Sequence, residues 1–197
     1  RSSDLIYHTS MIRDGLQIGL ALEDQIGINP LKFGLIGSTD THNSNPGDVE
    51  EWDYRGSTTF SGSPAKRRLD GDLTGSRYNN PGGLAAVWAP ENTREALFDS
   101  MKRKEVYATS GTRIKLRTFA GFDLPTDIAE TADIAAGYAN GVPMGGTLLA
   151  SEKASALSLF VWAVKDPDNA PLAKVQVIKG WLDNGERQEL VYDIACS

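Results

Sequence analysis

The sequence has very little cysteine and histidine and no long hydrophobic run. Cys196 is the single cysteine in 197 residues, so no disulfide can form within the chain and nothing indicates a redox compartment. No apolar run reaches the roughly 18 residues that a membrane-spanning helix needs. The histidines are His8 and His42 alone. The compartment is therefore unknown, and a periplasmic or secreted location stays open.

Positive charge is also in short supply. The formal net charge is −6 and the pI is about 5.0. Nucleic acid and anionic membranes both call for a basic face, so neither is expected as a main partner. The hydrophobic content of 40% is enough for a sizeable core, and composition gives no sign of disorder.

The start of the chain has the pattern of an α/β protein. Ile12, Leu16 and Leu20 recur at every fourth position, which predicts a helix over about 10–25 that Gly27 ends. The apolar run over 32–37 comes next, bounded by turn residues, and predicts a short buried strand. A helix, a short loop and a buried strand are typical of α/β folds.

A long polar stretch over 41–83 interrupts this pattern. It is rich in Gly, Ser, Asn, Asp and Pro and is far longer than most structureless connections. It is either an ordinary solvated loop or a lid in which Trp52 or the basic triplet 66–68 meets a substrate. The acids and amides within it, at 43, 45, 48 and 53, fit both interpretations.

The rest of the chain predicts one helix and then mainly antiparallel strands. Pro90 suits the first turn of a helix that runs to about Lys104, and short strands are expected over 106–109 and 114–119. Further strands are expected over 155–164, 174–181 and 189–192, with Asp183-Asn184-Gly185 as a hairpin turn. The tryptophans at 88, 162 and 181 lie in apolar contexts, which favour core positions over a sugar-stacking platform.

One short motif carries most of the chemistry. Asp40 and His42 come after the predicted buried strand at a spacing of two, within Gly37-Ser38-Thr39-Asp40-Thr41-His42. Catalytic groups gather at the carboxyl ends of strands in α/β folds, and carboxylate oxygen and imidazole nitrogen both bind Zn, Mn or Fe. The alternative is an aspartate that caps a turn and a histidine with an ordinary hydrogen bond.

The motif resembles the last conserved motif of the polymerase and histidinol phosphatase (PHP) superfamily, Gly-Ser-Asp-x-His, with Thr39 as one extra residue. The stretch 95–111, an Ala-Leu helix, a basic turn and Tyr-Ala-Thr-Ser-Gly, resembles the helix and strand located after that motif in some members. Together, 33–43 and 80–114 resemble the family known as domain of unknown function 3604, and the resemblance extends over nearly the whole chain.

The resemblance implies a fold and a division of the chain. Its fold class would be α/β followed by antiparallel β, with 1–120 as the C-terminal part of a PHP-like β/α barrel. Residues 121–145 would be a linker or insert, and 146–197 an antiparallel, sandwich-like segment. The chain begins at Arg1 rather than Met and ends on the strand-like run 191–194. We therefore expect a fragment, and the resemblance implies that its parent is a larger bacterial, amidohydrolase-like protein.

The resemblance also implies a function. The parent protein would be a metal-dependent hydrolase of a phosphate or related oxyanion ester, with Zn, Mn or Fe bound by Asp40 and His42 and a small anionic substrate. The first His-x-His motif would come from the N-terminal remainder of the same protein, its expected partner, so the fragment alone would be inactive. His8 has no neighbour at ligand spacing and is expected at the surface.

Arg113 completes the candidate site. It comes after Thr109-Ser110-Gly111, whose backbone amides can form an anion-binding nest beside the guanidinium. With the resemblance, this makes Arg113 an expected catalytic residue together with Asp40 and His42. The expected substrate contacts are Arg113, Thr109, Ser110 and Asn43. The alternative for Arg113 is a strand-edge salt bridge. Two rival functions stay open, a non-catalytic module that binds a ligand or partner and a purely structural end domain. The metal content of the full-length protein separates these functions, because an enzyme should contain a divalent metal in stoichiometric amount and the other two should not.

Overall fold

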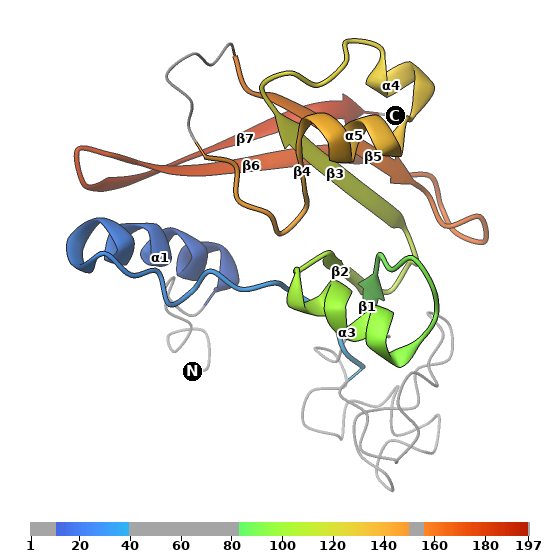
Figure 1. Ribbon diagram of the computed structural model, residues 1–197, viewed down its shortest axis with the longest axis horizontal. Helices are drawn as coiled ribbons and strands as arrows, with labels where there is room; N and C mark the ends of the chain where they lie inside the picture. Colours follow the sequence, from blue (N-terminus) through green and yellow to red (C-terminus); the bar gives the residue numbers. More distant parts are fainter. Residues whose placement is uncertain (1–10, 40–82, 150–155, 197) are drawn as a thin grey trace, which may run out of the picture. The chain divides into compact units, whose positions relative to one another are not determined.

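The computed structural model describes residues 11–39, 83–149 and 156–196 (Figure 1). The chain divides into two compact units. One contains Arg1–Phe33 and Pro171–Ser197, and the other contains Gly34–Ala170. Across the described ranges, no helix has the length and apolar character to cross a membrane.

The first unit begins with helix α1, Ile12–Ile26, close to the predicted range. Gly27 ends the helix in the left-handed region at φ 76°, and its amide donates to the carbonyl of Glu23. Glycine adopts this conformation without the steric cost of a β-carbon, so the predicted stop is confirmed.

A long hairpin forms the rest of this unit. Strands β6, Lys174–Asp183, and β7, Glu186–Cys196, pair antiparallel throughout their length. Asn184 and Gly185 have φ of 51° and 80°, as a tight hairpin turn with the natural strand twist requires. The predicted strands and their turn are confirmed.

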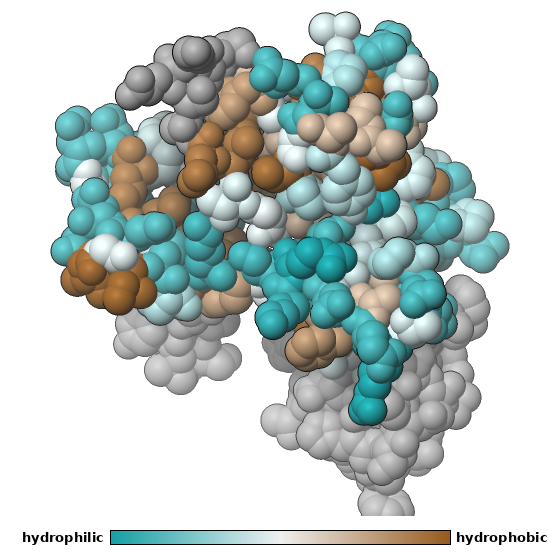
Figure 2. All heavy atoms as spheres, in the orientation of Figure 1, coloured by the Kyte–Doolittle hydropathy of each residue, from teal (hydrophilic) through white to brown (hydrophobic). Residues whose placement is uncertain are grey.

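Helix α1 packs on one face of the β6–β7 hairpin (Figure 1). Gly180 has no side chain there, and an added β-carbon would lie 3.1 Å from Cγ of Gln17. Glu189 accepts hydrogen bonds from both Arg13 and Gln17. Large apolar side chains on this unit stay exposed, among them Ile26 at 64% and Ile28 at 65%, and Figure 2 shows apolar surface mixed with polar on the face in view.

The second unit opens with a β–α–β segment whose strands pair antiparallel. Strand β1, Gly83–Val87, pairs with β2, Val106–Ser110, and helix α3, Arg94–Lys102, connects them. The predicted helix start at Pro90 is wrong. Thr93 is the N-cap, because its hydroxyl accepts a hydrogen bond from the amide of Ala96, and the helix therefore begins after it.

A three-stranded sheet holds the core of this unit. Strands β3, Lys115–Gly121, β4, Val142–Pro143, and β5, Ser158–Val164, are ordered β4-β3-β5, and all pairs are antiparallel. Helices α4, Ile128–Thr131, and α5, Ile134–Asn140, lie between β3 and β4 in the sequence. Phe119, Ile128 and Phe160 form the buried cluster on which these elements pack.

The fold is thus a mixture of helices and small antiparallel sheets. Every strand pair in the described ranges is antiparallel, in sheets of two, three and two strands, and these residues form no closed barrel. The antiparallel C-terminal part agrees with the prediction. The described residues of the N-terminal part do not show the expected α/β character, because the helix between β1 and β2 joins antiparallel neighbours.

The run over 32–37 corrects a second prediction. No strand forms there, and Phe33 and Ile36 are 44% and 58% exposed. A strand needs a neighbour for its backbone groups, and no described strand pairs with this run. The run is apolar, as the prediction assumed, but the described residues leave its large side chains exposed.

Candidate functional site

The motif residues Asp40, His42 and Asn43 lie outside the described residues, as does His8. The first residues of the motif, Gly37, Ser38 and Thr39, are described, and they fix the point from which Asp40 follows. Thr39 is 6% exposed. The motif therefore begins from a buried position in the second unit.

The segment 34–38 lies against strand β2 and the start of β1. A β-carbon on Gly34 would lie 3.1 Å from Cβ of Lys104, just before β2, and one on Gly37 would lie 2.7 Å from the carbonyl oxygen of Thr109, near the end of β2. The segment thus runs along β2 from its start towards its end. The motif consequently begins at the end that carries Thr109 and Ser110.

Two glycines allow this close approach. A β-carbon on Gly37 would also lie 2.7 Å from the carbonyl oxygen of Leu84, and one on Gly83 would lie 2.7 Å from that of Ser38. Contacts this short with backbone atoms are forbidden to any side chain, since the backbone cannot rotate away. Gly37, the first residue of the motif, is therefore a packing requirement of this site.

Thr109 places an unpaired hydroxyl beside this approach. The residue is 7% exposed, and its Oγ1 has no hydrogen-bond partner among the residues described. A buried hydroxyl without a partner costs about 1–3 kcal/mol, so native structures keep few of them, and these often mark functional positions. The sequence named Thr109 as a substrate contact, and that role stays a prediction.

The turn between β2 and β3 carries Arg113. The backbone amide of Arg113 donates to Oδ2 of Asp166 at 2.8 Å, and the amide of Asp168 donates to Oδ1 at 3.1 Å. Asp166 is 7% exposed, whereas Arg113 is exposed. Asp166 therefore fixes the backbone from which the guanidinium extends. Sequence reasoning missed this residue, although Asp-Pro-Asp after a strand is a turn pattern in which aspartate binds nearby amides.

The described ranges contain no group of three His, Cys, Asp or Glu residues that could hold a metal ion. Asp40 and His42 would supply two ligands, one carboxylate and one imidazole, a pair that suits Zn, Mn or Fe. A catalytic zinc site typically has about three protein ligands. The donor types thus fit a metal, and the unpaired Thr109 hydroxyl fits a polar site, but two ligands are too few.

A second polar cluster lies before the start of β2. Glu105 is 4% exposed, and its carboxylate accepts hydrogen bonds from Nε of Arg103 at 2.8 Å and from the hydroxyl of Tyr138. Nη2 of Arg117 lies 4.0 Å from the same carboxylate and donates to the Tyr138 hydroxyl at 2.6 Å. Sequence reasoning missed this cluster, because Glu105 and Tyr138 are 33 positions apart and the members share no motif.

Aromatic rings surround the Arg117 guanidinium. Its Cζ lies 4.4 Å from the Trp88 ring centroid and 5.3 Å from that of Tyr138, within the range of cation–π attraction. The Trp88 indole N–H donates to the carbonyl of Leu116 at 2.9 Å. Trp162 packs against the core cluster as predicted, whereas Trp88 is only partly buried and lines a pocket.

The same cluster changes the acidity of Tyr138. Burial raises the pKa of the Tyr138 phenol above its ordinary value near 10, and its hydrogen bond to Glu105 raises it further. The nearby Arg117 guanidinium acts in the opposite direction and is outweighed. Tyr138 is therefore a neutral donor at physiological pH.

Comparison with known proteins places the whole chain in one family. The model of the family described as "Protein of unknown function (DUF3604)" matches residues 1–197. No curated protein and no solved structure gives a significant match. The match covers the full sequence, including the motif, the β1–α3–β2 segment and the C-terminal hairpin. The chain belongs to the DUF3604 family.

Proposed function

We propose that this chain contributes to the active site of a metal-dependent hydrolase of the PHP type, which acts on a phosphate or related oxyanion ester. The observation that supports it best is the position of the motif. The segment before Asp40 lies against the end of β2, beside the buried and unpaired hydroxyl of Thr109. Metal ligands, a polar pocket wall and an anion-binding turn would then share one strand end.

Asp40 and His42 are the proposed metal ligands, for Zn, Mn or Fe. A bound divalent metal lowers the pKa of its water towards neutrality and stabilises negative charge on the substrate. The Asp40 carboxylate can also accept the proton that the attacking water loses, because a carboxylate beside the water is a suitable general base. His42 would bind through one ring nitrogen, with the other held by a hydrogen bond.

Arg113, Thr109, Ser110 and Asn43 are the proposed substrate contacts. The guanidinium of Arg113 offers paired donors to an oxyanion, and its anchored backbone limits where that group can reach. The Thr109 hydroxyl, which has no hydrogen-bond partner among the described residues, can donate to a substrate oxygen. Each contact stabilises negative charge that grows in the transition state.

The proposal includes a longer polypeptide. Two ligands fall short of the three that a catalytic zinc site commonly has, and the PHP resemblance assigns a His-x-His pair to a preceding part of the protein. The exposed apolar side chains of Phe33 and Ile36 support this, since exposed apolar surface suits contact with a further part of the protein. The chain alone should therefore show little hydrolysis.

The test is hydrolysis of generic phosphomonoesters and phosphodiesters with Mn²⁺ or Zn²⁺. The full-length protein should be active, and His42→Ala should reduce kcat/KM by more than the roughly 100-fold that loss of a ligand-supporting residue costs. His8→Ala is the matched control, because it removes the other histidine, and it should leave kcat/KM unchanged. Equal activity of both variants would refute the site, and turnover by this chain alone that His42→Ala abolishes would refute the longer-polypeptide part.

A further inference from the structure

A pocket of about 440 Å³ lies beside the Glu105 cluster in the second unit. Its walls include Trp88, Pro90, Arg103, Arg117 and Ile134, so apolar and cationic groups face the same space. The volume is within the range of roughly 300–1,000 Å³ that small-molecule sites occupy. The mixture of rings with a few charged groups is also what such sites contain.

The charges that line this pocket do not balance. Two guanidinium groups, of Arg103 and Arg117, accompany the single carboxylate of Glu105, which leaves one net positive charge. Burial raises the pKa of the third ionisable group, Tyr138, so that its phenol stays neutral.

The two guanidiniums also keep donors available. The Arg103 side chain is 53% exposed and directs Nε to Glu105 and Nη2 to Ser100. Arg117 is held on the Trp88 ring, and its hydrogen bonds within the described ranges go to Tyr138 alone. A guanidinium carries five N–H donors in a fork that matches an oxyanion, so donors remain on both.

We propose that this pocket binds a small organic molecule through an oxyanion, a carboxylate or a sulfate, with the rest of the molecule against Trp88, Pro90 and Ile134. The excess positive charge selects the anion, and the apolar wall selects an attached ring or short chain.

This site is separate from the proposed hydrolytic one. Glu105 precedes the first residue of β2, whereas Thr109 lies near its last. Four residues of extended strand separate them by about 14 Å. Binding here therefore does not depend on a metal at Asp40 and His42.

The test uses benzoate as the probe, with benzamide as its neutral counterpart and inorganic sulfate as an anion without a ring. Each is titrated into the chain by isothermal calorimetry, and the melting curve of every variant is recorded to show that it folds. Benzoate should bind with a Kd on the order of 1 mM, which a ligand of this size can reach.

Arg103→Gln should raise the Kd of benzoate at least about tenfold, because a charge-assisted contact is lost. Arg94→Gln is the matched control, since it removes the same charge from an exposed position at the other end of the helix that Arg103 caps, and it should leave the Kd unchanged. If Arg103→Gln fails to fold, Pro90→Glu adds a negative charge at the exposed rim and should weaken benzoate as well.

Four results would overturn the proposal: no binding of benzoate, an unchanged Kd in the folded Arg103→Gln or Pro90→Glu variant, an equal loss of benzoate affinity in Arg94→Gln, or benzamide binding as tightly as benzoate. Tighter binding of benzoate than of sulfate supports an organic anion. Equal binding of both would refute the apolar part of the site.

Discussion

Replacement of Glu105 by glutamine should destabilise the second unit more than any surface charge change does. The Glu105 side chain is 6% exposed and that of Arg117 is 14% exposed, so both charges are largely removed from water. Removing one partner of such a buried pair costs about 3–5 kcal/mol, since the other charge is left without compensation. Arg103 adds little, because its side chain is 53% exposed and water screens it.

Glutamine is close in shape to glutamate and keeps one acceptor oxygen. We therefore expect Glu105→Gln to lose about 2–3 kcal/mol, the scale of a hydrogen bond to a charged group, and Glu105→Ala to lose about 3–5 kcal/mol. For a chain of this length, 1 kcal/mol shifts Tm by about 2–4 °C, so Glu105→Gln should lower it by roughly 5–10 °C.

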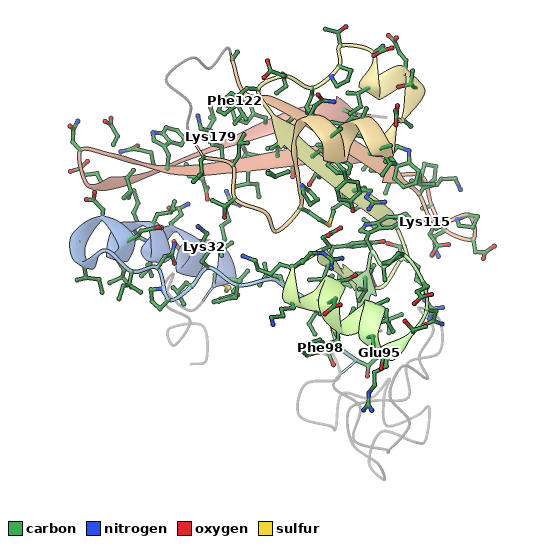
Figure 3. All side chains as sticks on the ribbon, viewed as in Figure 1. Lys32, Glu95, Phe98, Lys115, Phe122 and Lys179 are labelled. Atoms are coloured by element: carbon green, nitrogen blue, oxygen red, sulfur yellow. The ribbon has the colours of Figure 1, made fainter. Side chains whose placement is uncertain are left out.

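The assay is urea unfolding followed by circular dichroism. Glu95→Gln is the control, because Glu95 projects from α3 into solvent (Figure 3) and lies in its first turn, where loss of the charge costs about 0.5 kcal/mol. Adding Arg117→Met to Glu105→Gln should restore part of the loss, since the unpaired charge is removed. Equal free energies of unfolding for Glu105→Gln and Glu95→Gln would refute this account of the cluster.

Three further perturbations test other parts of the structure. Gly37→Ala should destabilise by about 1–3 kcal/mol in urea unfolding, because its β-carbon would meet two carbonyl oxygens at 2.7 Å, whereas Gly15→Ala, with nothing within 4 Å, should not destabilise. Asp166→Ala should cost about 1–3 kcal/mol by the same assay, since two backbone amides lose their acceptor. The hydrogen bond from Arg13 lowers the pKa of Glu189 below 4.5, so its stabilising contribution is present above that pH and is lost as pH falls through the lowered pKa. Stability measured against pH should therefore fall less steeply on the acid side in Glu189→Gln, and an unchanged slope would contradict the pairing.

The sequence correctly predicted the elements whose formation depends on residues close together in the chain. The spacing of Ile12, Leu16 and Leu20 with Gly27 indicated α1, and Asn184-Gly185 indicated the hairpin turn, because both signals act within a few residues. The start of α3 was missed because Pro90 and Thr93 are both residue types that often lie at a helix start. The hydrogen bond that the Thr93 hydroxyl accepts from a backbone amide places the start after Thr93.

Long-range packing accounts for the features that local patterns did not reveal. The strand expected over 32–37 depends on a neighbour, and apolar composition alone does not say whether one exists. The cluster of Glu105, Arg117 and Tyr138 comes from three separate parts of the chain and has no motif, so only the fold brings it together. The sequence pattern could single out Thr109. It could not show that the Thr109 hydroxyl is buried without a hydrogen-bond partner among the described residues.

The metal content of the full-length protein tests the central claim most directly. Purified wild-type protein should contain Zn, Mn or Fe in stoichiometric amount by inductively coupled plasma mass spectrometry, and Asp40→Asn or His42→Ala should lose at least part of it, whereas His8→Ala should retain it. Wild-type protein that binds no divalent metal when Zn²⁺, Mn²⁺ or Fe²⁺ is supplied, or a His42→Ala variant that keeps the full amount, would contradict the account.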